Sequence, residues 1–260
     1  MEYKITYLGQ KENEILEKII SEDEFSKIMN SVSWLKTTMP IKDYLYMVNK
    51  CIDELLIASK TTGCGQEHNF SELNRLFNGF IGNYYSWLSY MEKHYKTVLL
   101  PIKKKAYDNN IEYRLIYYLR EFASHYDMAV DQVTFDVLTE NVHWYIKPES
   151  LLHYDLKDIN KRFEQDIQFL KSNNQKIDVF ELVLKFRTIF DTMIQEIYDA
   201  LIPEINQHWN FLVQHLKIEE KCPFLIIDVY ICEIGNDKHP FNLTGFVNLF
   251  NKKMQTDERA

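Results

Sequence analysis

Apolar residues recur every three or four positions along most of the chain, and this spacing constrains the fold more than any other feature. Similar patterns cover residues 43–56, 73–95, 111–122, 156–170 and 179–216. The interval matches the 3.6-residue turn of an α-helix, so each segment is predicted to be helical. The chain holds only 7 Gly and 6 Pro in 260 residues. A fold of many short strands needs more turn residues, so a mainly α fold is expected.

A few segments fit strands instead. Residues 3–8 alternate polar and apolar side chains. Residues 133–137 and 142–146 alternate with period two on either side of a polar turn, which predicts a small β-hairpin. Residues 223–232 form a dense apolar run that we expect to be a late edge strand. Residues 12–20 carry a weak helical pattern.

Prolines and polar runs predict where helices end. A second weak helical pattern covers residues 22–35. Pro101 is expected to close the helix that begins near Ser71, with Lys103-Lys104-Lys105 in the loop that follows. Pro203 is expected to kink or break the last long helix. The chain is thus predicted to be a helical bundle with a small β-hairpin insertion and a helical C-terminal half, as one body or two lobes meeting near residue 130.

The charge balance limits the partners. The formal net charge is -8 and the pI is near 5.5. A protein that coats nucleic acid by bulk electrostatics is normally basic, although a local basic pocket remains compatible with these values. The four cysteines match no metal knuckle and are expected to be reduced thiols in a cytoplasmic protein. The run at residues 224–227 stops at Asp228, well short of the roughly 20 apolar residues of a membrane span.

The sequence contains none of the common cofactor or catalytic spacings. It has no phosphate-binding Gly-rich loop, no Gly-x-Gly-x-x-Gly, no His-Glu-x-x-His and no Gly-x-Ser-x-Gly. His208 and His215 lie seven residues apart, so they would share a helix face. They could bind a metal together, but no third ligand accompanies them at helical spacing, which favours two satisfied core-margin side chains. No metal or cofactor is expected.

Two adjacent tyrosine pairs have alternative interpretations. Tyr84-Tyr85 and Tyr117-Tyr118 could stack on nucleic-acid bases, or they could belong to the core or its rim. The lysine run at residues 103–105 is most simply a solvated surface. If it lies beside the helix that follows, it could help to hold RNA phosphates.

Arg120 and His125 are the candidate catalytic residues. They lie at the C-terminal end of one amphipathic helix, five positions apart. Five positions are about 140° beyond a full turn, so the two side chains would converge only if the helix ends or loosens between them. The alternative is an arginine in a surface ion pair and a histidine whose cation is favoured by the helix dipole.

The context of this spacing resembles a known family. Residues 112–126, EYRLIYYLREFASHY, look like the last signature helix of the HEPN-domain proteins, helical bundles marked by Arg-x4-6-His. Residues 73–85, LNRLFNGFIGNYY, are similar to the helix that packs beside it in uncharacterised bacterial members. The resemblance covers residues 43–127. It implies a HEPN-like bundle over residues 1–129. It leaves residues 130–260 as a mixed α/β region, either separate from the bundle or part of the same body.

The resemblance implies a metal-independent endoribonuclease whose active site forms at a homodimer interface. RNA carries its own nucleophile, the 2′-hydroxyl, so the protein must move protons and stabilise phosphoryl charge. In this scheme His125 transfers protons and Arg120 holds the non-bridging oxygens. Arg75 and Asn78 could support the phosphate or orient Arg120, and packing at the core edge is an equal alternative. The expected product is a 2′,3′-cyclic phosphate.

Glu121 departs from the family pattern, in which the residue after the arginine is commonly Asn or another polar residue. A carboxylate there would repel a phosphate unless it points away or pairs with Arg75 or Arg114. Two functions therefore stay open: an active ribonuclease, or a catalytically inactive HEPN-fold binding and assembly module. By resemblance, the partners are RNA, a second copy, and a cognate antitoxin or nucleotidyltransferase of a toxin-antitoxin or anti-phage defence system.

Overall fold

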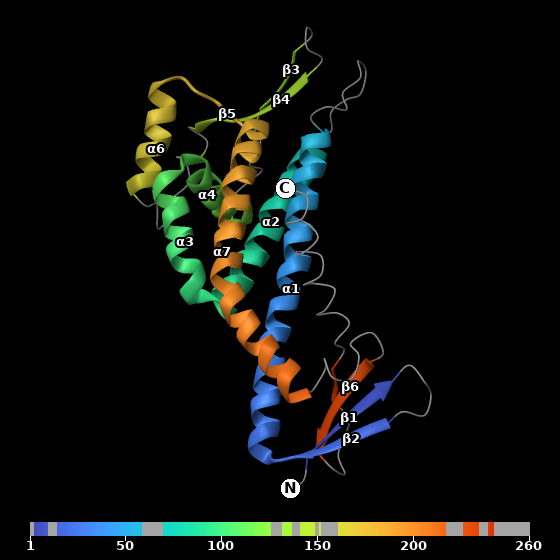
Figure 1. Ribbon diagram of the computed structural model, residues 1–260. Coiled ribbons are helices and arrows are strands. Elements are labelled where there is room, and N and C mark those ends of the chain that lie inside the picture. Colours follow the sequence, from blue (N-terminus) through green and yellow to red (C-terminus); the bar gives the residue numbers. More distant parts are fainter. Residues whose placement is uncertain are drawn as a thin grey trace, which may run out of the picture. The chain divides into compact units, whose positions relative to one another are not determined.

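The computed structural model is mainly helical, as the apolar spacing predicted. It describes the backbone of residues 3–9, 15–58, 70–125, 132–136, 141–148, 151, 161–216, 226–233 and 239–241, and the side chains of residues 19–58, 72–120, 143–148, 151 and 161–215. The helices are α1 Glu22–Ala58, α2 Phe70–His94, α3 Lys96–Asn109, α4 Ile111–His125, α6 Lys161–Ser172 and α7 Val179–Leu216 (Figure 1). None of them, over the residues described, is both long and apolar enough to span a membrane.

The chain divides into two compact units. Residues 1–38 and 202–260 form the terminal unit, and residues 39–201 form the central unit. This border differs from the division expected near residue 130, because strands from the two ends of the chain pair with each other. The border crosses α1 near Pro40 and α7 near Pro203. α7 continues through Pro203, so the proline costs a backbone hydrogen bond without breaking the helix.

The terminal unit contains a four-stranded antiparallel sheet. Its strands are β1 Tyr3–Gly9, β2 Ile15–Ile20, β6 Ile226–Glu233 and β7 His239–Phe241, in the order β2-β1-β6-β7. The helical interpretation of residues 12–20 was wrong where the structure describes them, because residues 15–20 pair with β1. The edge-strand interpretation of the late apolar run was also wrong, since β6 lies between β1 and β7. Pairing on both sides suits its nearly continuous apolar sequence.

In the helical part of the terminal unit, both histidines of the candidate pair are partly buried, and each contacts separate neighbours. The ring of His208 stacks on Trp34 with centroids 4.7 Å apart, and its Nδ1 is hydrogen-bonded to Ser31 Oγ at 3.1 Å. Nδ1 of His215 lies 2.9 Å from the carbonyl of Phe211 on its own helix. Within the described residues, no group of three or more His, Cys, Asp or Glu side chains could hold a metal ion.

The central unit is built around an aromatic core shared by α2, α4 and α7. Phe186 on α7 packs against Tyr84 with ring centroids 5.0 Å apart and against Tyr113 at 6.2 Å. Phe190 meets Trp87 edge to face at 4.9 Å. All five side chains are 1% exposed or less. Each buried aromatic contributes roughly 1.5 to 3 kcal/mol through removal of apolar surface from water, so this cluster holds the three helices together.

The break between α2 and α3 differs from the expected one. The helix ends at His94, Tyr95 has a non-helical φ of -134°, and α3 then includes both Pro101 and the lysine run. Placing Lys103-Lys104-Lys105 in a loop was therefore wrong. The apolar spacing could not reveal this break, because Met91, Tyr95 and Leu99 keep an interval of four across it and all three are buried.

A three-stranded sheet lies at one end of the central unit. The predicted hairpin is confirmed as β3 Gln132–Asp136 paired with β4 Asn141–Ile146. A third strand, β5 Ile177–Asp178, pairs with β4 and leads directly into α7. Asp178 caps that helix, because its Oδ1 accepts hydrogen bonds from the backbone N–H groups of Phe180 and Glu181 at 2.9 and 3.1 Å.

Candidate functional site

The structure separates the members of the two tyrosine pairs. Neighbouring residues on a helix point about 100° apart, so one of each pair can face the core while the other does not. Tyr84 and Tyr118 are 1% and 7% exposed. Tyr85 is 45% exposed, and Tyr117 is partly buried. One member of each pair therefore belongs to the core and the other does not. Tyr84 and Tyr118 belong to the core, whereas Tyr85 and Tyr117 lie at the surface.

Arg120 contacts both surface tyrosines. Its guanidinium carbon lies 4.1 Å from the centre of the Tyr85 ring and 5.4 Å from that of Tyr117. Lys103 Nζ lies 5.3 Å from the Tyr117 ring. We name these four residues, from α2, α3 and α4, the cation–tyrosine cluster. Lys103 therefore lies beside α4, the helix that follows it, although Lys103 itself belongs to helix α3 and not to a loop.

The contacts in the cluster are of the kind that orient a guanidinium. A cation over the face of an aromatic ring is attracted by the ring quadrupole. Stacking uses the flat face of the guanidinium, whereas carboxylates and phosphates bind the N–H groups along its edge. Arg120 is half-buried, so its charge lies at the boundary of the bundle. An arginine held in this way has a defined plane, which suits bidentate binding of a phosphate.

A buried tyrosine pair lies behind the cluster. The Tyr84 hydroxyl donates a hydrogen bond to the Tyr113 hydroxyl at 3.0 Å. Burial raises the pKa of Tyr84 well above its usual value, and burial raises the pKa of Tyr113 to about 12. Both phenols are therefore neutral at pH 7, which makes this pair a structural support and not a proton donor for chemistry near neutrality.

Arg114 is bound within the core. It is 4% exposed, and its Nη2 donates to Asp166 Oδ1 at 3.0 Å while Nε donates to Oδ2 of the same carboxylate. Its Nη1 donates to the carbonyl of Tyr107 at 2.7 Å. The hydrogen bonds that Arg114 donates to Asp166 raise the pKa of Arg114. This arginine links α4 to α6.

Arg75 and Asn78 lie on the exposed surface of α2. Arg75 Nε donates to Glu72 Oε2 at 2.6 Å, one turn earlier on the same helix. Asn78 and Tyr85 are seven residues apart, so they share a side of α2. Neither Arg75 nor Asn78 packs at the core edge, and the recorded ion pair of Arg75 is with Glu72, not with a residue of α4.

His125 and Glu121 belong to α4, and their side chains lie outside the described residues. The helix continues through His125, its last residue. It therefore does not loosen between Arg120 and His125. On a continuous helix, five residues correspond to a rise of about 7.5 Å and to about 140° beyond a full turn. The backbone positions of the two candidates therefore lie on different faces of α4, and the condition under which the two residues of one copy would converge is not met.

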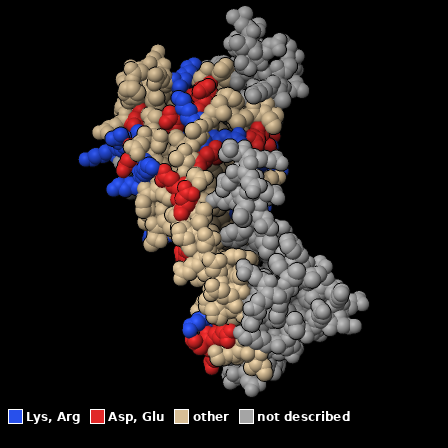
Figure 2. All heavy atoms as spheres, in the orientation of Figure 1, with Lys and Arg blue, Asp and Glu red and all other residues tan. Residues whose placement is uncertain are grey.

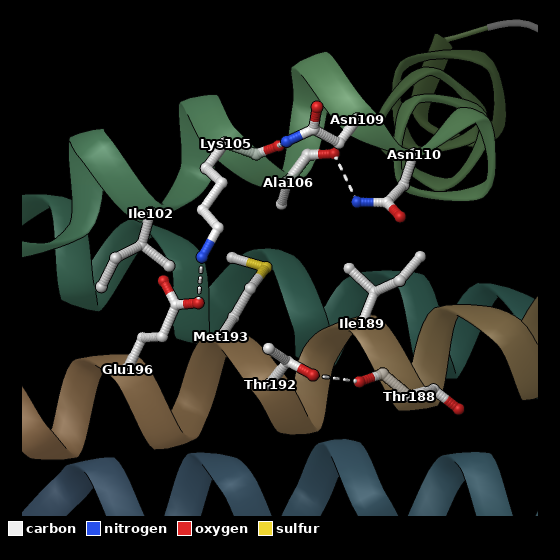
Figure 3. A pocket seen from close by; sticks show the side chains of 10 residues that line it. All are labelled: Ile102, Lys105, Ala106, Asn109, Asn110, Thr188, Ile189, Thr192, Met193 and Glu196. Atoms are coloured by element: carbon white, nitrogen blue, oxygen red, sulfur yellow. Dashed lines mark hydrogen bonds and ion pairs between the residues drawn. The ribbon is translucent and has the colours of Figure 1, made fainter.

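A cavity of about 300 Å³ lies between α3 and α7, away from the cluster (Figure 3). Its apolar lining includes Ala106 and Met193, and the ion pair of Lys105 with Glu196 spans it at 2.5 Å (Figure 3). The Asn110 amide donates to the carbonyl of Ala106 on its own helix. The charged and amide groups that line the cavity thus bind each other or the backbone. We therefore assign the cavity to helix packing.

The described surface carries charges of both signs. Figure 2 shows Lys and Arg side chains interspersed with Asp and Glu on the visible face. On this face, a binding site for an anion must therefore depend on a local group of cations and not on a broad basic surface. No family model, curated protein or solved structure matches this chain.

Proposed function

We propose that this protein is a metal-independent endoribonuclease of the HEPN type, with RNA bound at the cation–tyrosine cluster. The observation that carries the proposal is the contact of Arg120 with Tyr85, in which the guanidinium carbon lies 4.1 Å from the ring centre. This contact holds the arginine of the Arg-x4-His spacing at the surface of the bundle, next to an aromatic residue that is 45% exposed. Aromatic rings beside cations are the usual elements of single-strand binding.

The chemistry assigns a role to each residue. Arg120 binds the non-bridging oxygens of the scissile phosphate and stabilises the charge that develops on them. His125 has an ordinary pKa near 6.5, so it can accept the proton of the 2′-hydroxyl or protonate the leaving 5′-oxygen. Lys103 adds positive charge beside Tyr117. Asn78, on the side of α2 that carries Tyr85, contacts the flanking backbone of the RNA, and Arg75, three residues earlier on α2, contacts it further along.

Two histidines are needed for two proton transfers, and a twofold dimer supplies them. We therefore propose that the active form is a homodimer in which the α4 ends of two copies approach each other. In a cell such an enzyme requires restraint, and a cognate antitoxin or nucleotidyltransferase of a toxin-antitoxin or anti-phage system fits that need.

The alternative is a catalytically inactive HEPN-fold module for binding or assembly. Two ion pairs support this alternative: Glu92 pairs with Lys103 at 2.6 Å, and Glu72 pairs with Arg75. Each pair reduces the positive charge that an RNA phosphate would meet. In this case the cluster would hold a partner without cleaving it.

The test is digestion of a mixed-sequence RNA by the full-length protein, with and without chelator. We expect chelator-resistant cleavage that leaves a 2′,3′-cyclic phosphate. His125→Ala should lower the rate by about 10²- to 10⁴-fold, the usual contribution of acid–base catalysis. Arg120→Lys should also be strongly impaired, because lysine cannot bind two oxygens in one plane.

Arg187→Ala is the matched control. It removes an arginine that pairs with Asp53 at 2.8 Å on the surface of the same unit, away from the proposed site. Circular dichroism checks that each variant is folded. Chelator-sensitive cleavage, or full activity of His125→Ala, would disprove the mechanism. If the wild type does not cleave RNA, the remaining proposal is the catalytically inactive binding module.

A further inference from the structure

A second cavity, of about 690 Å³, lies at one end of the central unit. Its lining comes from α4, α6 and α7 and from strands β4 and β5. Figure 1 shows α6, β5 and the start of α7 together at that end. The volume is typical of small-molecule sites, which are mostly apolar and carry a few polar groups. The cavity is separate from the cation–tyrosine cluster, because it includes Ile111 at the first end of α4 whereas Arg120 lies near the second.

The floor of this cavity is apolar. Leu115, Ile177 and Leu182 line it and are 4%, 5% and 4% exposed. Phe169 of α6 also lines it, but this residue is 59% exposed. A large aromatic side chain that stays open beside buried aliphatic ones forms a wall that the apolar part of a ligand can cover. Removal of this surface from water favours binding of an apolar group.

Two charged groups of the cavity have no ion-pair partner in the part of the chain that the structure describes. They are the ammonium of Lys176, which lies 5.4 Å from the centre of the Tyr145 ring, and the carboxylate of Glu181. Lys185 and Glu112, which also line the cavity, pair with each other at 3.6 Å. The cavity therefore offers one cation and one anion to a ligand. It differs in this respect from the cavity between α3 and α7, where the charges are paired (Figure 3).

The backbone that carries this cation and anion is fixed on both sides of β5. At the end of α6, Asn174 has a left-handed φ of 54°, and the Gln175 N–H donates to the Leu170 carbonyl at 2.9 Å, which is a common helix-ending turn. At the start of α7, Asp178 caps the helix, and its Oδ2 lies 3.0 Å from His143 Nδ1 on β4. A site whose backbone is already ordered pays less conformational entropy when a ligand binds.

We infer that this cavity binds a small zwitterion with an apolar body, which is the chemistry of an amino acid or dipeptide with a large apolar side chain. Lys176 binds the carboxylate of the ligand, Glu181 binds its ammonium group, and Phe169 covers its apolar side chain. A simple organic anion would be repelled by Glu181, and a simple organic cation would be repelled by Lys176. A ligand with both charges pairs with both groups. The inference does not depend on the proposed ribonuclease activity.

The experiment is isothermal titration calorimetry of the full-length protein with phenylalanine and with the dipeptide Leu-Phe. N-acetylphenylalanine lacks the ammonium group, phenylalanine methyl ester lacks the carboxylate, and glycine lacks the apolar body. Each of these three compounds should bind at least about tenfold more weakly than phenylalanine, because each loses one of the contacts. Comparison of phenylalanine with Leu-Phe shows which of the two ligand sizes the cavity prefers.

Variants of the cavity test the assignment of the charges. Lys176→Gln and Glu181→Gln should each weaken binding of the preferred zwitterion by about tenfold, the usual effect of losing a hydrogen bond between charged groups. Lys50→Gln and Glu54→Gln are the matched controls. They change an exposed lysine and an exposed glutamate of α1, and neither residue lines the cavity. Circular dichroism checks that every variant is folded.

The site is supported if a zwitterion binds, the three incomplete compounds bind more weakly, and only the two cavity variants reduce the affinity. It is overturned if the wild type binds neither phenylalanine nor Leu-Phe, or if an incomplete compound binds as tightly as phenylalanine. It is also overturned if either cavity variant binds like the wild type. Because none of these measurements involves RNA, the failure of this site and the failure of the proposed ribonuclease are distinguishable.

Discussion

The two ends of α4 carry one arginine each and use them in opposite ways. At the first end, Arg114 is 4% exposed and its N–H groups bind Asp166 and the Tyr107 carbonyl. At the second end, Arg120 is half-buried and lies against the rings of Tyr85 and Tyr117. The N–H groups of the first arginine bind within the fold. The guanidinium of the second lies over two tyrosine rings at the boundary of the bundle.

The difference teaches that charge alone does not identify a functional arginine. Both residues occur in the segment that resembles the HEPN signature helix, and both have aromatic neighbours, since Arg114 also lies 6.0 Å from the Tyr107 ring. What distinguishes them is burial, because Arg114 is 4% exposed and bound to Asp166 and to the Tyr107 carbonyl, whereas Arg120 is half-buried. Substitutions at the two ends should therefore separate stability from function.

The largest effect on stability is expected from Arg114→Met. It leaves the carboxylate of Asp166, 12% exposed, without its cation, and removal of one partner from a buried pair costs about 3 to 5 kcal/mol. Urea unfolding followed by circular dichroism measures this cost. The double variant Arg114→Met with Asp166→Leu should recover much of it, because no uncompensated charge remains. A cost below about 1 kcal/mol would show that the pair behaves like a surface one.

An intermediate effect is expected at alkaline pH from the tyrosine pair beside Arg114. The pKa of Tyr113 is raised to about 12 in the folded protein, from an ordinary value near 10. Above pH 10 the unfolded chain loses this proton while the folded protein keeps it, so stability falls as pH rises. Two pKa units correspond to about 3 kcal/mol at most, reached near pH 12.

Equilibrium unfolding between pH 8 and pH 12 measures this dependence. Tyr113→Phe removes the titrating group and should make the decline shallower, whereas Tyr46→Phe, an exposed tyrosine on α1, should leave it unchanged. An identical slope for the wild type and Tyr113→Phe would contradict the raised pKa.

The smallest effect on stability is expected from Arg120→Met. A half-exposed cation–π contact contributes about 0.5 to 1 kcal/mol, far less than the buried pair of Arg114. A double-mutant cycle with Tyr85→Leu should return a coupling free energy of this size. If Arg120→Met destabilises the protein as much as Arg114→Met does, the contrast between the two ends of α4 is lost.

Much of the helical structure was predictable from local spacing. The segments around residues 111–122 and 179–216 became α4 and α7. Residues 22–58 were not foreseen as one helix, because apolar periodicity lapses around Pro40. The strand at residues 15–20 was missed because its identity depends on pairing with β1. Secondary structure set by a distant partner leaves little signal in its own residues.

The candidate site was only partly predictable. Arg120 was selected from its spacing to His125, and the tyrosines were recognised as stacking or core residues. Their division between core and surface was not predictable, since Tyr84 and Tyr85 differ by one position on the same helix. The position of Lys103 beside the helix that follows was raised only as a condition, and its contact with Tyr117 was not predicted. The partner of Arg114 lies 52 residues further along the chain.

The sequence by itself determined that the chain is mainly helical and which faces of its helices are apolar, because helical periodicity is a property of neighbouring residues. The tertiary structure alone decided which arginine of α4 is bound in the core by Asp166 and which is stacked on Tyr85. That decision depends on which helices meet. Contacts between distant segments are set by the packing of the whole unit, so the same residue type supports the fold at one end of α4 and forms the candidate site at the other.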